Sequence, residues 1–313
     1  MSNEYQAATE SAALFDLSDH GKIEVTGPDA RSFLHNLCTQ NVQNLPVGSF
    51  CEAFLTTNKA RVIAHVWISQ PENNVLELDL AAGQADKVLQ HLDHYLISEQ
   101  VELADRSSEF ALLRLVGPKA AELLNRAAMT PLRRHRLLAL DGYDLLCPVA
   151  ESADLQKRLV DAGAVCASRE TYEILRVEAG LPEYGIDIDE NRLAMEVGRT
   201  AQAICYTKGC FLGQETIVMA RDRGQVNRLM MGVKIAVGSP LSPGTKLYRG
   251  NEEVGHVTSS VFSPRLGAVL ALAYLRRGSC DPGMELIVEP ATDGRTAVVC
   301  SLPFLSGADS VLP

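Results

Sequence analysis

The chain has 313 residues, of which 46% are hydrophobic and 22% are charged. This composition is typical of a folded globular protein with two or three domains, and it excludes disordered and fibrous classes. A formal net charge of −10 argues against a general nucleic-acid-binding surface, because phosphate binding depends on clustered Lys and Arg. The richest apolar stretch, residues 266–275, is far shorter than a membrane span.

Cysteine spacing and the first residues define the expected compartment. The eight cysteines show no CxxC or Cys/His ligand spacing, so we expect neither a disulfide framework nor a metal site. Glu4, Glu10 and Asp16 occur with no basic run ahead of an apolar core, unlike a secretion or transit signal. We therefore expect a cytoplasmic protein without membrane or direct nucleic-acid contacts, whose links to RNA are indirect.

The first half of the chain mixes strand and helix patterns. Ile23 and Val25 alternate with polar residues, which predicts a strand at 21–27, and Phe33, Leu34 and Leu37 share one face of a following helix. Further strands are predicted at 50–69, 75–80 and 111–116, and further helices at 84–97, after 117–118 and through 155–160. A hairpin is predicted around Asp141-Gly142. The pattern is that of an α+β protein.

Two transitions follow in the second half. Residues 170–178 predict a helix that ends at Glu178, because Gly180 fits a C-cap and Pro182 stops continuation. After Gly224, short Val-rich runs alternate with Gly, Pro and Asn turns, which predicts an all-β unit. We place the boundary between about residues 225 and 240.

The octapeptide 208–215 is the strongest candidate for chemistry, with Cys210 beside a cation, between two glycines and ahead of a predicted helix. Lys208 and the helix dipole would both favour thiolate, so we expect a lowered pKa for Cys210. The alternative is that Cys210 is a small buried hydrophobe, as most free cysteines are. Residue chemistry alone leaves both interpretations open.

The octapeptide resembles the signature of YgfZ-type folate-binding proteins, relatives of the glycine-cleavage T-protein (aminomethyltransferase). The matching positions are Lys208, Gly209, Cys210, Phe211, Gly213, Gln214 and Glu215. Weaker matches occur in the family's order at 17–34, 115–120, 175–180 (Leu-Arg-Val-Glu-Ala-Gly) and 254–259 (Val-Gly-His-Val-Thr-Ser). The resemblance thus covers nearly the whole chain.

This resemblance implies three domains around a central folate channel: two plait-like α+β domains, the first discontinuous, and a C-terminal β-barrel. We expect residues 1–48 and 135–230 to form the first, folate-binding domain, residues 49–134 the second and residues 231–313 the barrel. Tetrahydrofolate, or a derivative, is the implied cofactor. The implied partners are folate and iron-sulfur assembly proteins or cluster enzymes.

The resemblance also implies site residues. Glu178 would hold the pterin, since a carboxylate accepts both parallel N–H donors of its amino-pyrimidine edge. Arg176 and Arg223 are further expected folate contacts, although for the anionic glutamate tail the sequence does not choose among Arg221, Arg223 and Arg228. Cys210 would be a reactive or partner-contacting thiol, with Lys208 as its activating neighbour.

One departure bears on activity. T-proteins carry a catalytic acid in an Asp-Asp pair, and Ala64-His65 falls at the corresponding place here. A lone histidine on a strand is more often a packed residue than a base. The resemblance therefore implies a folate-binding protein that supports iron-sulfur cluster assembly or repair, and through cluster enzymes tRNA modification. Alternatives are a folate-dependent one-carbon transferase, such as an aminomethyltransferase or demethylase, or a structural module; whether it is an enzyme stays open.

Overall fold

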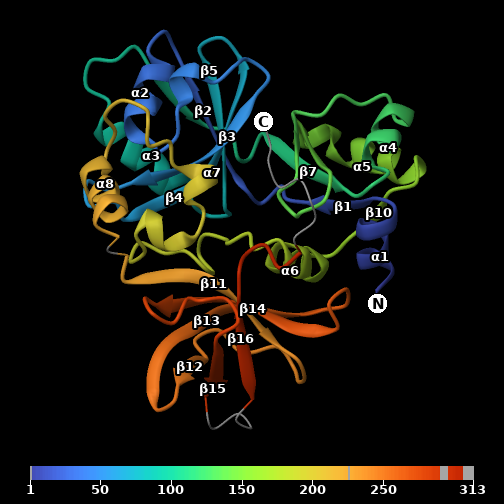
Figure 1. Cartoon of the computed structure of the whole chain (residues 1–313). Coiled ribbons are helices and arrows are strands. Elements are labelled where there is room, and N and C mark those ends of the chain that lie inside the picture. Colours follow the sequence, from blue (N-terminus) through green and yellow to red (C-terminus); the bar gives the residue numbers. More distant parts are fainter. Residues whose placement is uncertain (1, 225, 290–294, 306–313) are drawn as a thin grey trace.

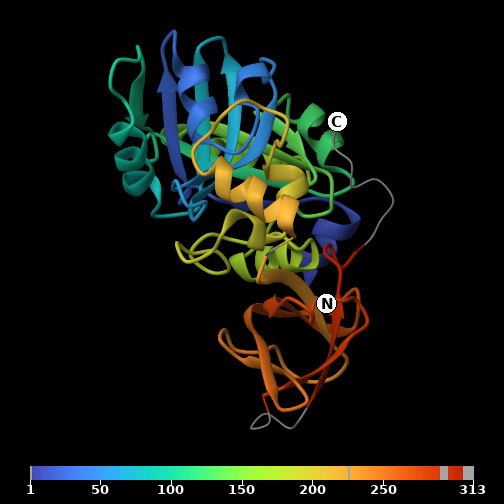
Figure 2. The same ribbon diagram turned by 60° about the vertical axis from the view of Figure 1, so that its left-hand side comes forward.

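Two α/β lobes stand side by side above a barrel, and helix α6 (Arg169–Glu178) lies where they meet (Figures 1 and 2). The computed structural model describes residues 2–224, 226–289 and 295–305. We call the two five-stranded sheets sheet I and sheet II. The predicted α+β class with a C-terminal barrel is confirmed.

Helices α4 and α5 cover one face of sheet I, and α1, α6 and sheet II cover the other. Leu14, Leu113 and Leu115 pack against α4 and α5, while Phe15 and Leu112 face α1 and α6. Its strands, in spatial order, are β10 (Val165–Cys166), β1 (Ala13–Asp16), β7 (Phe110–Val116), β9 (Gly142–Pro148) and β8 (Arg133–His135). Its helices are α1 (Asn3–Glu10), α4 (Ala120–Arg126) and α5 (Ser152–Asp161), with η2 (Val149–Glu151) before α5.

Sheet II shows the alternation that its sequence predicts. Ile23, Val25 and Leu78 face α2 and α3, whereas the intervening side chains point toward sheet I. Its strands, in spatial order, are β3 (Phe50–Thr56), β4 (Val62–Glu72), β5 (Val75–Leu80), β2 (Gly21–Thr26) and β6 (Glu102–Asp105). Its helices are α2 (Ala30–Leu37) and α3 (Ala85–His94), with η1 (Val42–Asn44); the later segments η3 (Ala194–Val197), α7 (Thr200–Ala203) and α8 (Gln214–Arg223) pack beside it.

The predicted boundaries at 48/49 and 134/135 need correction. One α/β unit does interrupt the other, but the interrupting strands run from β2 to β6, residues 21–105. β2 pairs with β5 from Gly21 to Thr26, so a boundary at 48/49 would split sheet II. A boundary at 134/135 falls inside β8. Strand pairing joins segments distant in sequence, and local patterns do not reveal it.

The barrel closes six antiparallel strands, with an apolar interior that includes Val233, Leu247 and Val257. Its strands, in spatial order, are β11 (Arg228–Ile235), β14 (Ala268–Arg276), β13 (Glu252–Ser263), β12 (Lys246–Arg249), β15 (Glu285–Val288) and β16 (Thr296–Cys300). Helix α6 packs on β13 and β14, which attaches the barrel to the α/β lobes. The predicted boundary between 225 and 240 contains the start of β11.

Candidate functional site

Sheet II meets sheet I through charged side chains. Asp144 of β9 is fully buried and accepts from Arg114 Nε and Nη2 at 2.7 and 2.9 Å, from Arg133 Nε at 2.5 Å and from His135 Nε2 at 3.0 Å. Arg133 also pairs with Asp79 of sheet II. Burial alone would raise the pKa of Asp144, but the guanidinium groups of Arg114 and Arg133 hold it well below its ordinary value. This network joins the sheets.

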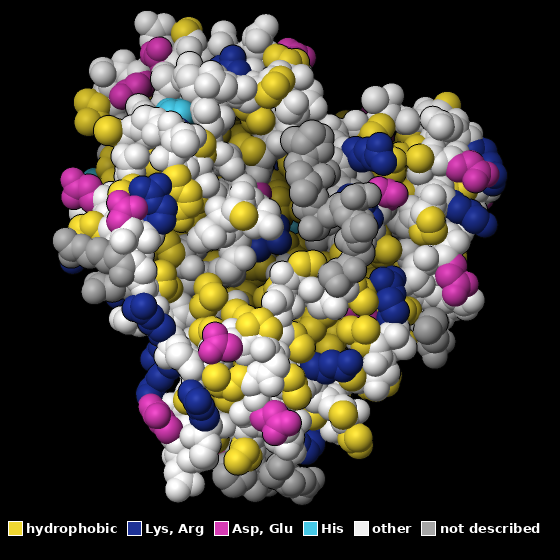
Figure 3. Space-filling model, viewed as in Figure 1, with side chains coloured by type: hydrophobic (Ala, Val, Ile, Leu, Met, Phe, Trp, Pro, Cys, Tyr) yellow, Lys and Arg dark blue, Asp and Glu magenta, His cyan; other side chains and the backbone are white. Residues whose placement is uncertain are grey.

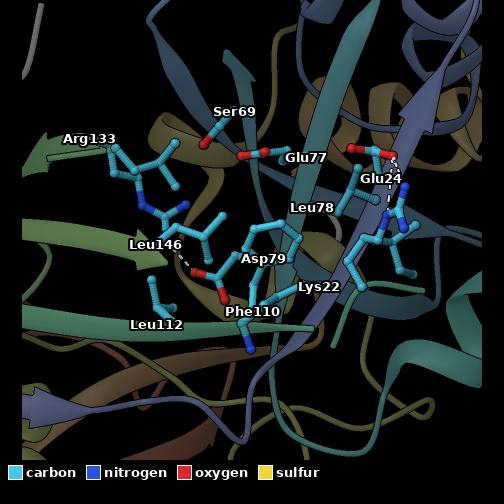
Figure 4. A pocket seen from close by; sticks show the side chains of 13 residues that line it. Lys22, Glu24, Ser69, Glu77, Leu78, Asp79, Phe110, Leu112, Arg133 and Leu146 are labelled. Atoms are coloured by element: carbon cyan, nitrogen blue, oxygen red, sulfur yellow. Dashed lines mark hydrogen bonds and ion pairs between the residues drawn. The ribbon is translucent and has the colours of Figure 1, made fainter. Parts of the chain in front are cut away.

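A cavity opens on one side of the network, between β2, β5, β7 and β9 (Figure 4). Ser69 and Glu77, directly opposite on β4 and β5, point toward one another, and Ser69 Oγ and Glu77 Oε2 are buried without a hydrogen-bond partner among the described residues. Burial and the nearby negative charge of Glu24 raise the pKa of Glu77. Leu112 and Leu146 form the apolar wall.

A second cavity lies where sheet I, sheet II and α6 converge, and we call it the central cavity. The space between its walls, including the part open to solvent, is about 470 Å³. The aromatic rings of Trp67, Tyr172 and Tyr184 contribute to its walls. The other lining residues are His20, His65, Leu80, Ala81, Arg114, Arg176, Leu181, Pro182 and Glu183. Aromatic faces with a few polar groups suit a flat heteroaromatic ligand.

His65 reaches the central cavity from β4 and belongs to a closed polar triad. Its Nε2 lies 2.8 Å from Glu52 Oε1, and its ring packs beside Phe54 and Trp67. Arg199 donates to both oxygens of Glu52, at 2.8 and 2.5 Å. Although burial would raise the pKa of Glu52, Arg199 and His65 lower it to about 2. Glu52 is therefore a poor proton acceptor at neutral pH.

Arg176 lines the central cavity, but its donors are used within the protein. Nε and Nη2 pair with Glu173, Nη1 donates to Asp187 at 2.7 Å and to the Leu181 carbonyl, and Nη2 donates to Ser259 of the barrel at 2.9 Å. The guanidinium has five N–H donors, and these contacts occupy them. These contacts lock α6 to the barrel; the expected folate contact of Arg176 stays a prediction, which a full set of protein partners does not favour.

Glu178 ends α6, as its sequence predicts, and is 1% exposed. Its Oε1 accepts from Tyr5 Oη at 2.7 Å and from Ser263 Oγ at 2.5 Å, on the side of α6 that faces α1 and the barrel. Its Oε2 is buried with no hydrogen-bond partner among the described residues. Phe304 N donates to the Glu178 carbonyl and so closes this end of the helix.

The octapeptide lies between α7 and α8 and docks on α2. Lys208 is buried, and its Nζ donates to the carbonyls of His35, Cys38 and Gln40. An ammonium has three donors, and all three are used at the C-terminal end of α2, where a cation is favoured. Lys208 therefore has a structural role in docking the loop on α2, and the expected activation of Cys210 by Lys208 stays a prediction.

The other motif residues mostly shape the loop. Gly213 has φ +84°, and a Cβ there would lie 2.6 Å from the Thr57 carbonyl oxygen, so only glycine fits. Phe211 is buried in the core beside α8. Gln214 Nε2 reaches the Gly209 carbonyl at 3.5 Å, and Glu215 lies in the first turn of α8. A Cβ at Gly209 would meet no described atom within 4 Å.

Cys210 is exposed, so the interpretation as a small buried hydrophobe is wrong. Cys205, on the same loop, has a lowered pKa. Burial raises its pKa, but hydrogen bonds from Thr207 and from the backbone of Thr207 and Lys208 outweigh that effect. The loop thus carries one exposed thiol, Cys210, and one partly buried thiol whose pKa is lowered, Cys205.

Three further observations complete the site. The side chain of Arg223 lies outside the described part of the structure, and Arg221 pairs with Asp222. Among the described residues, no three His, Cys, Asp or Glu side chains come together as a metal site. None of the described helices is both long enough and apolar enough to cross a bilayer.

Comparison with known proteins identifies the family. A model described as the GCVT N-terminal domain matches residues 1–137, and one described as the glycine cleavage T-protein C-terminal barrel domain matches residues 228–305. An aminomethyltransferase of Rubrobacter xylanophilus is 30% identical over 305 residues, which cover 91% of this chain and 81% of that protein. The chain belongs to the glycine cleavage T-protein (aminomethyltransferase) family.

Two further similarities also extend over most of the chain. A putative chloroplastic transferase of Arabidopsis thaliana is 25% identical across 96% of this chain and 73% of its own length. The crystal structure of the glycine cleavage system aminomethyltransferase T from Bartonella henselae superposes with a TM-score of 0.85 and 22% identity, over 96% of this chain and 88% of that chain. At this identity the superposition shows the shared T-protein fold alone.

Sequence reasoning missed the charged network between the sheets. Arg114 and Asp144 each interrupt an apolar strand, at 110–116 and 142–148. A charged residue inside an apolar strand requires a partner when buried, which was the available signal. The identity of that partner depends on which strands pair, so the sequence pattern did not supply it.

Proposed function

We propose that this member of the T-protein family binds tetrahydrofolate at the junction of its three lobes without acting as an aminomethyltransferase. The observation that carries the proposal is the polar triad of His65, Glu52 and Arg199. T-proteins place a paired carboxylate in this segment, whereas here His65 is hydrogen-bonded to a carboxylate whose pKa is lowered to about 2. The triad supports a structural role for His65 and Glu52 in the cavity wall, in preference to a role as proton acceptors.

The residues present are compatible with a folate. Trp67, Tyr172 and Tyr184 offer aromatic faces to a pterin in the central cavity. Glu178 does not line this cavity: its carboxylate lies on the side of α6 that faces α1 and the barrel, so the expected pterin contact depends on access to its unpartnered Oε2. Glu183 is the competing carboxylate, because it lines the central cavity while pairing with Arg169 and Arg176. Bound tetrahydrofolate would supply a carrier for one-carbon groups; the protein's part is to hold and orient it.

The test compares two single variants by calorimetric titration with tetrahydrofolate. If Glu178 holds the pterin, Glu178→Gln weakens binding by roughly 1–3 kcal/mol, since one acceptor becomes a donor facing a donor. The matched control Glu183→Gln should retain affinity. Unchanged affinity of Glu178→Gln would remove Glu178 from the site, and a loss confined to Glu183→Gln would move the pterin contact there.

We further propose that the protein supports iron-sulfur cluster assembly or repair, with Cys210 as the thiol that meets a partner. The resemblance of the octapeptide to YgfZ-type proteins suggests this role, and the exposure of Cys210 is compatible with it. Cys210→Ala should keep the fold and folate affinity but fail to restore a cluster-dependent tRNA-modifying enzyme in cells. Cys166→Ala, which removes another exposed thiol, is the control. Full complementation by Cys210→Ala would contradict the role.

A one-carbon transferase is the second candidate, favoured by the names of the relatives. In that case His65 would be the group at the central cavity that handles the proton. Formation of 5,10-methylenetetrahydrofolate from a lipoyl-bound or N-methyl substrate, abolished in His65→Ala, would establish it. If folate binds but no product forms, the protein is a folate-binding protein without this transferase activity.

A further inference from the structure

The cavity of Figure 4 lies outside the proposed folate site, and we call it the Glu77 cavity. Among the described residues, it shares no lining residue with the central cavity. The two cavities are neighbours, because His20 lines the central cavity and its Nδ1 lies 2.7 Å from Oδ1 of Asp79, which lines the Glu77 cavity. The space between its walls, including the part open to solvent, is about 500 Å³. The Glu77 cavity can therefore hold a small ligand of its own.

A row of three polar side chains crosses sheet II at this cavity. Ser69 on β4 stands directly opposite Glu77 on β5, and Glu77 stands directly opposite Glu24 on β2. Ser69 is 3% exposed, and its hydroxyl points toward Glu77 (Figure 4). Neither Ser69 Oγ nor Glu77 Oε2 has a hydrogen-bond partner within the described part of the chain. Because buried polar groups are normally hydrogen-bonded, both atoms retain the capacity to bind a ligand.

The two acids of this row form an unfavourable pair, since like charges directly opposite each other destabilise a sheet. Glu24 is compensated, because Arg106 donates to its Oε1 from Nε at 3.3 Å and from Nη2 at 3.0 Å. Glu77 forms no ion pair among the described residues, and Arg133, whose charge lowers the pKa of Glu77, is engaged by two other carboxylates. Burial and the charge of Glu24 prevail and raise that pKa.

We propose that the Glu77 cavity binds a small primary amine, as its ammonium ion, with a short aliphatic chain. A primary ammonium has three N–H donors, enough for Glu77 and Ser69 together, and its charge offsets the repulsion between Glu77 and Glu24. The chain lies against Leu112 and Leu146, the apolar wall, where burial of CH₂ groups is favourable (Figure 4). Water can satisfy the same hydrogen bonds, but it carries no charge and leaves the repulsion in place.

Selectivity for the amine comes from the cavity and not from the surface around it. The net charge of −10 attracts cations in general. On the face shown in Figure 3, however, the acidic side chains are scattered among basic ones over all three lobes. Surface charge of this kind does not distinguish one small cation from another, whereas the paired oxygens of Ser69 and Glu77 require N–H donors.

The experiment is an NMR titration of the whole protein at neutral pH with isobutylamine, isobutanol and tetramethylammonium, followed on the backbone amides of β4 and β5. Isobutanol has the same chain without the charge, and tetramethylammonium has the charge without N–H donors. Isobutylamine should bind about tenfold more tightly than either, since each lacks part of a charge-assisted hydrogen bond.

Three variants locate the bound amine. Glu77→Gln should weaken the binding of isobutylamine about tenfold or more, and Ser69→Ala about two- to tenfold, because each loses a hydrogen bond to a charged group. The charge-matched control Glu102→Gln, an exposed acid on β6 of the same sheet, should change affinity less than about twofold. Glu77→Gln should also keep or raise the melting temperature, since it relieves the repulsion with Glu24.

The proposal is overturned by no binding of isobutylamine, by equal affinity for isobutanol or tetramethylammonium, or by equal weakening in the control. Displacement of isobutylamine by tetrahydrofolate would place the amine in the central cavity and would also overturn it, whereas simultaneous binding supports a separate site. If Glu77→Gln does not fold, a carboxyl-carbon NMR titration of the unaltered protein decides. The pKa of Glu77 should fall when isobutylamine binds, because a nearby cation favours the carboxylate, and no fall would contradict the site.

Discussion

The barrel interior and the contact between the two sheets are equally buried but chemically opposite. The barrel encloses aliphatic side chains such as Val233, Leu247 and Val257. The sheets meet through Arg114, Asp144 and Arg133, which are at most 4% exposed. Aliphatic packing loses stability in proportion to the cavity created, whereas a buried ion network fails when one partner is removed. The two polar cavities lie beside this charged contact. The contact therefore holds the sheets together and also borders space in which a ligand can bind.

The largest effect is expected from Asp144→Asn. This change removes the charge that three buried side chains share, takes from Arg114 its ion-pair partner and leaves Arg133 paired with Asp79 alone, which should cost about 3–5 kcal/mol in the free energy of unfolding. Urea denaturation measures it. Asp141→Asn, a partly exposed acid in longer ion pairs of 3.5 and 3.9 Å, is the control and should change stability by less than about 0.5 kcal/mol. A loss below that of the control would contradict the network's role.

Leu247→Ala tests the apolar side of the comparison. Leu247 is fully buried in the barrel, so truncation should cost about 2–4 kcal/mol through lost burial and a residual cavity. The same urea series measures it, with the exposed Val237→Ala as control. A cost that equals or exceeds that of Asp144→Asn would reverse the ranking of the two regions.

Lys208→Met tests whether the octapeptide lysine is structural. The variant keeps the aliphatic stem but leaves the carbonyls of His35, Cys38 and Gln40 without their donor, which should cost about 1.5–3 kcal/mol. Thermal and urea unfolding measure the loss. Unchanged stability, together with a changed reactivity of Cys210 toward a thiol reagent, would support the activating role.

Acid titration of Glu52 tests the triad at the cavity wall. Its pKa falls from 4.5 to about 2 on folding, so its contribution is present above pH 4.5 and is lost as the pH falls toward 2. Wild type should lose roughly 1.5 kcal/mol more than Glu52→Gln between about pH 4.5 and pH 3. Parallel stability curves in this window would show that Glu52 is not held ionised.

Cys210→Ser should have the smallest effect on stability, less than about 0.5 kcal/mol, because the side chain is exposed. Thermal unfolding measures it, and Cys38→Ser, a fully buried thiol near Lys208, is the contrasting variant with a larger loss. A large loss at Cys210 would place that thiol in the core.

Local patterns predicted individual elements well. The strand at 75–80, the helix with Phe33, Leu34 and Leu37 buried, and the helix end at Glu178 are confirmed. Each depends on residues within one or two turns, where periodicity and capping act directly. The predicted domain boundary at 48/49 failed, because the pairing of β2 with β5 joins residues 49 to 59 positions apart.

The same distinction between local and distant information applies to the candidate site. The octapeptide and the Leu-Arg-x-Glu-Ala-Gly segment marked Cys210, Lys208 and Glu178 from sequence, yet the structure gives Lys208 three backbone carbonyls and Arg176 a full set of protein partners. A charged side chain is chemically the same in a pocket and in a structural network. Only its neighbours distinguish a binding role from a structural role, and these neighbours come from distant segments of the chain.

The sequence by itself determined the α+β pattern, the change to an all-β unit after Gly224 and the likeness to the T-protein family. The tertiary structure alone decided that the polar face of sheet II, with Lys22 and Asp79, is buried against sheet I instead of facing water. Alternation specifies that a strand has one apolar and one polar face. It does not specify what covers the polar face, because that depends on charges such as Arg133 that arrive from another part of the chain.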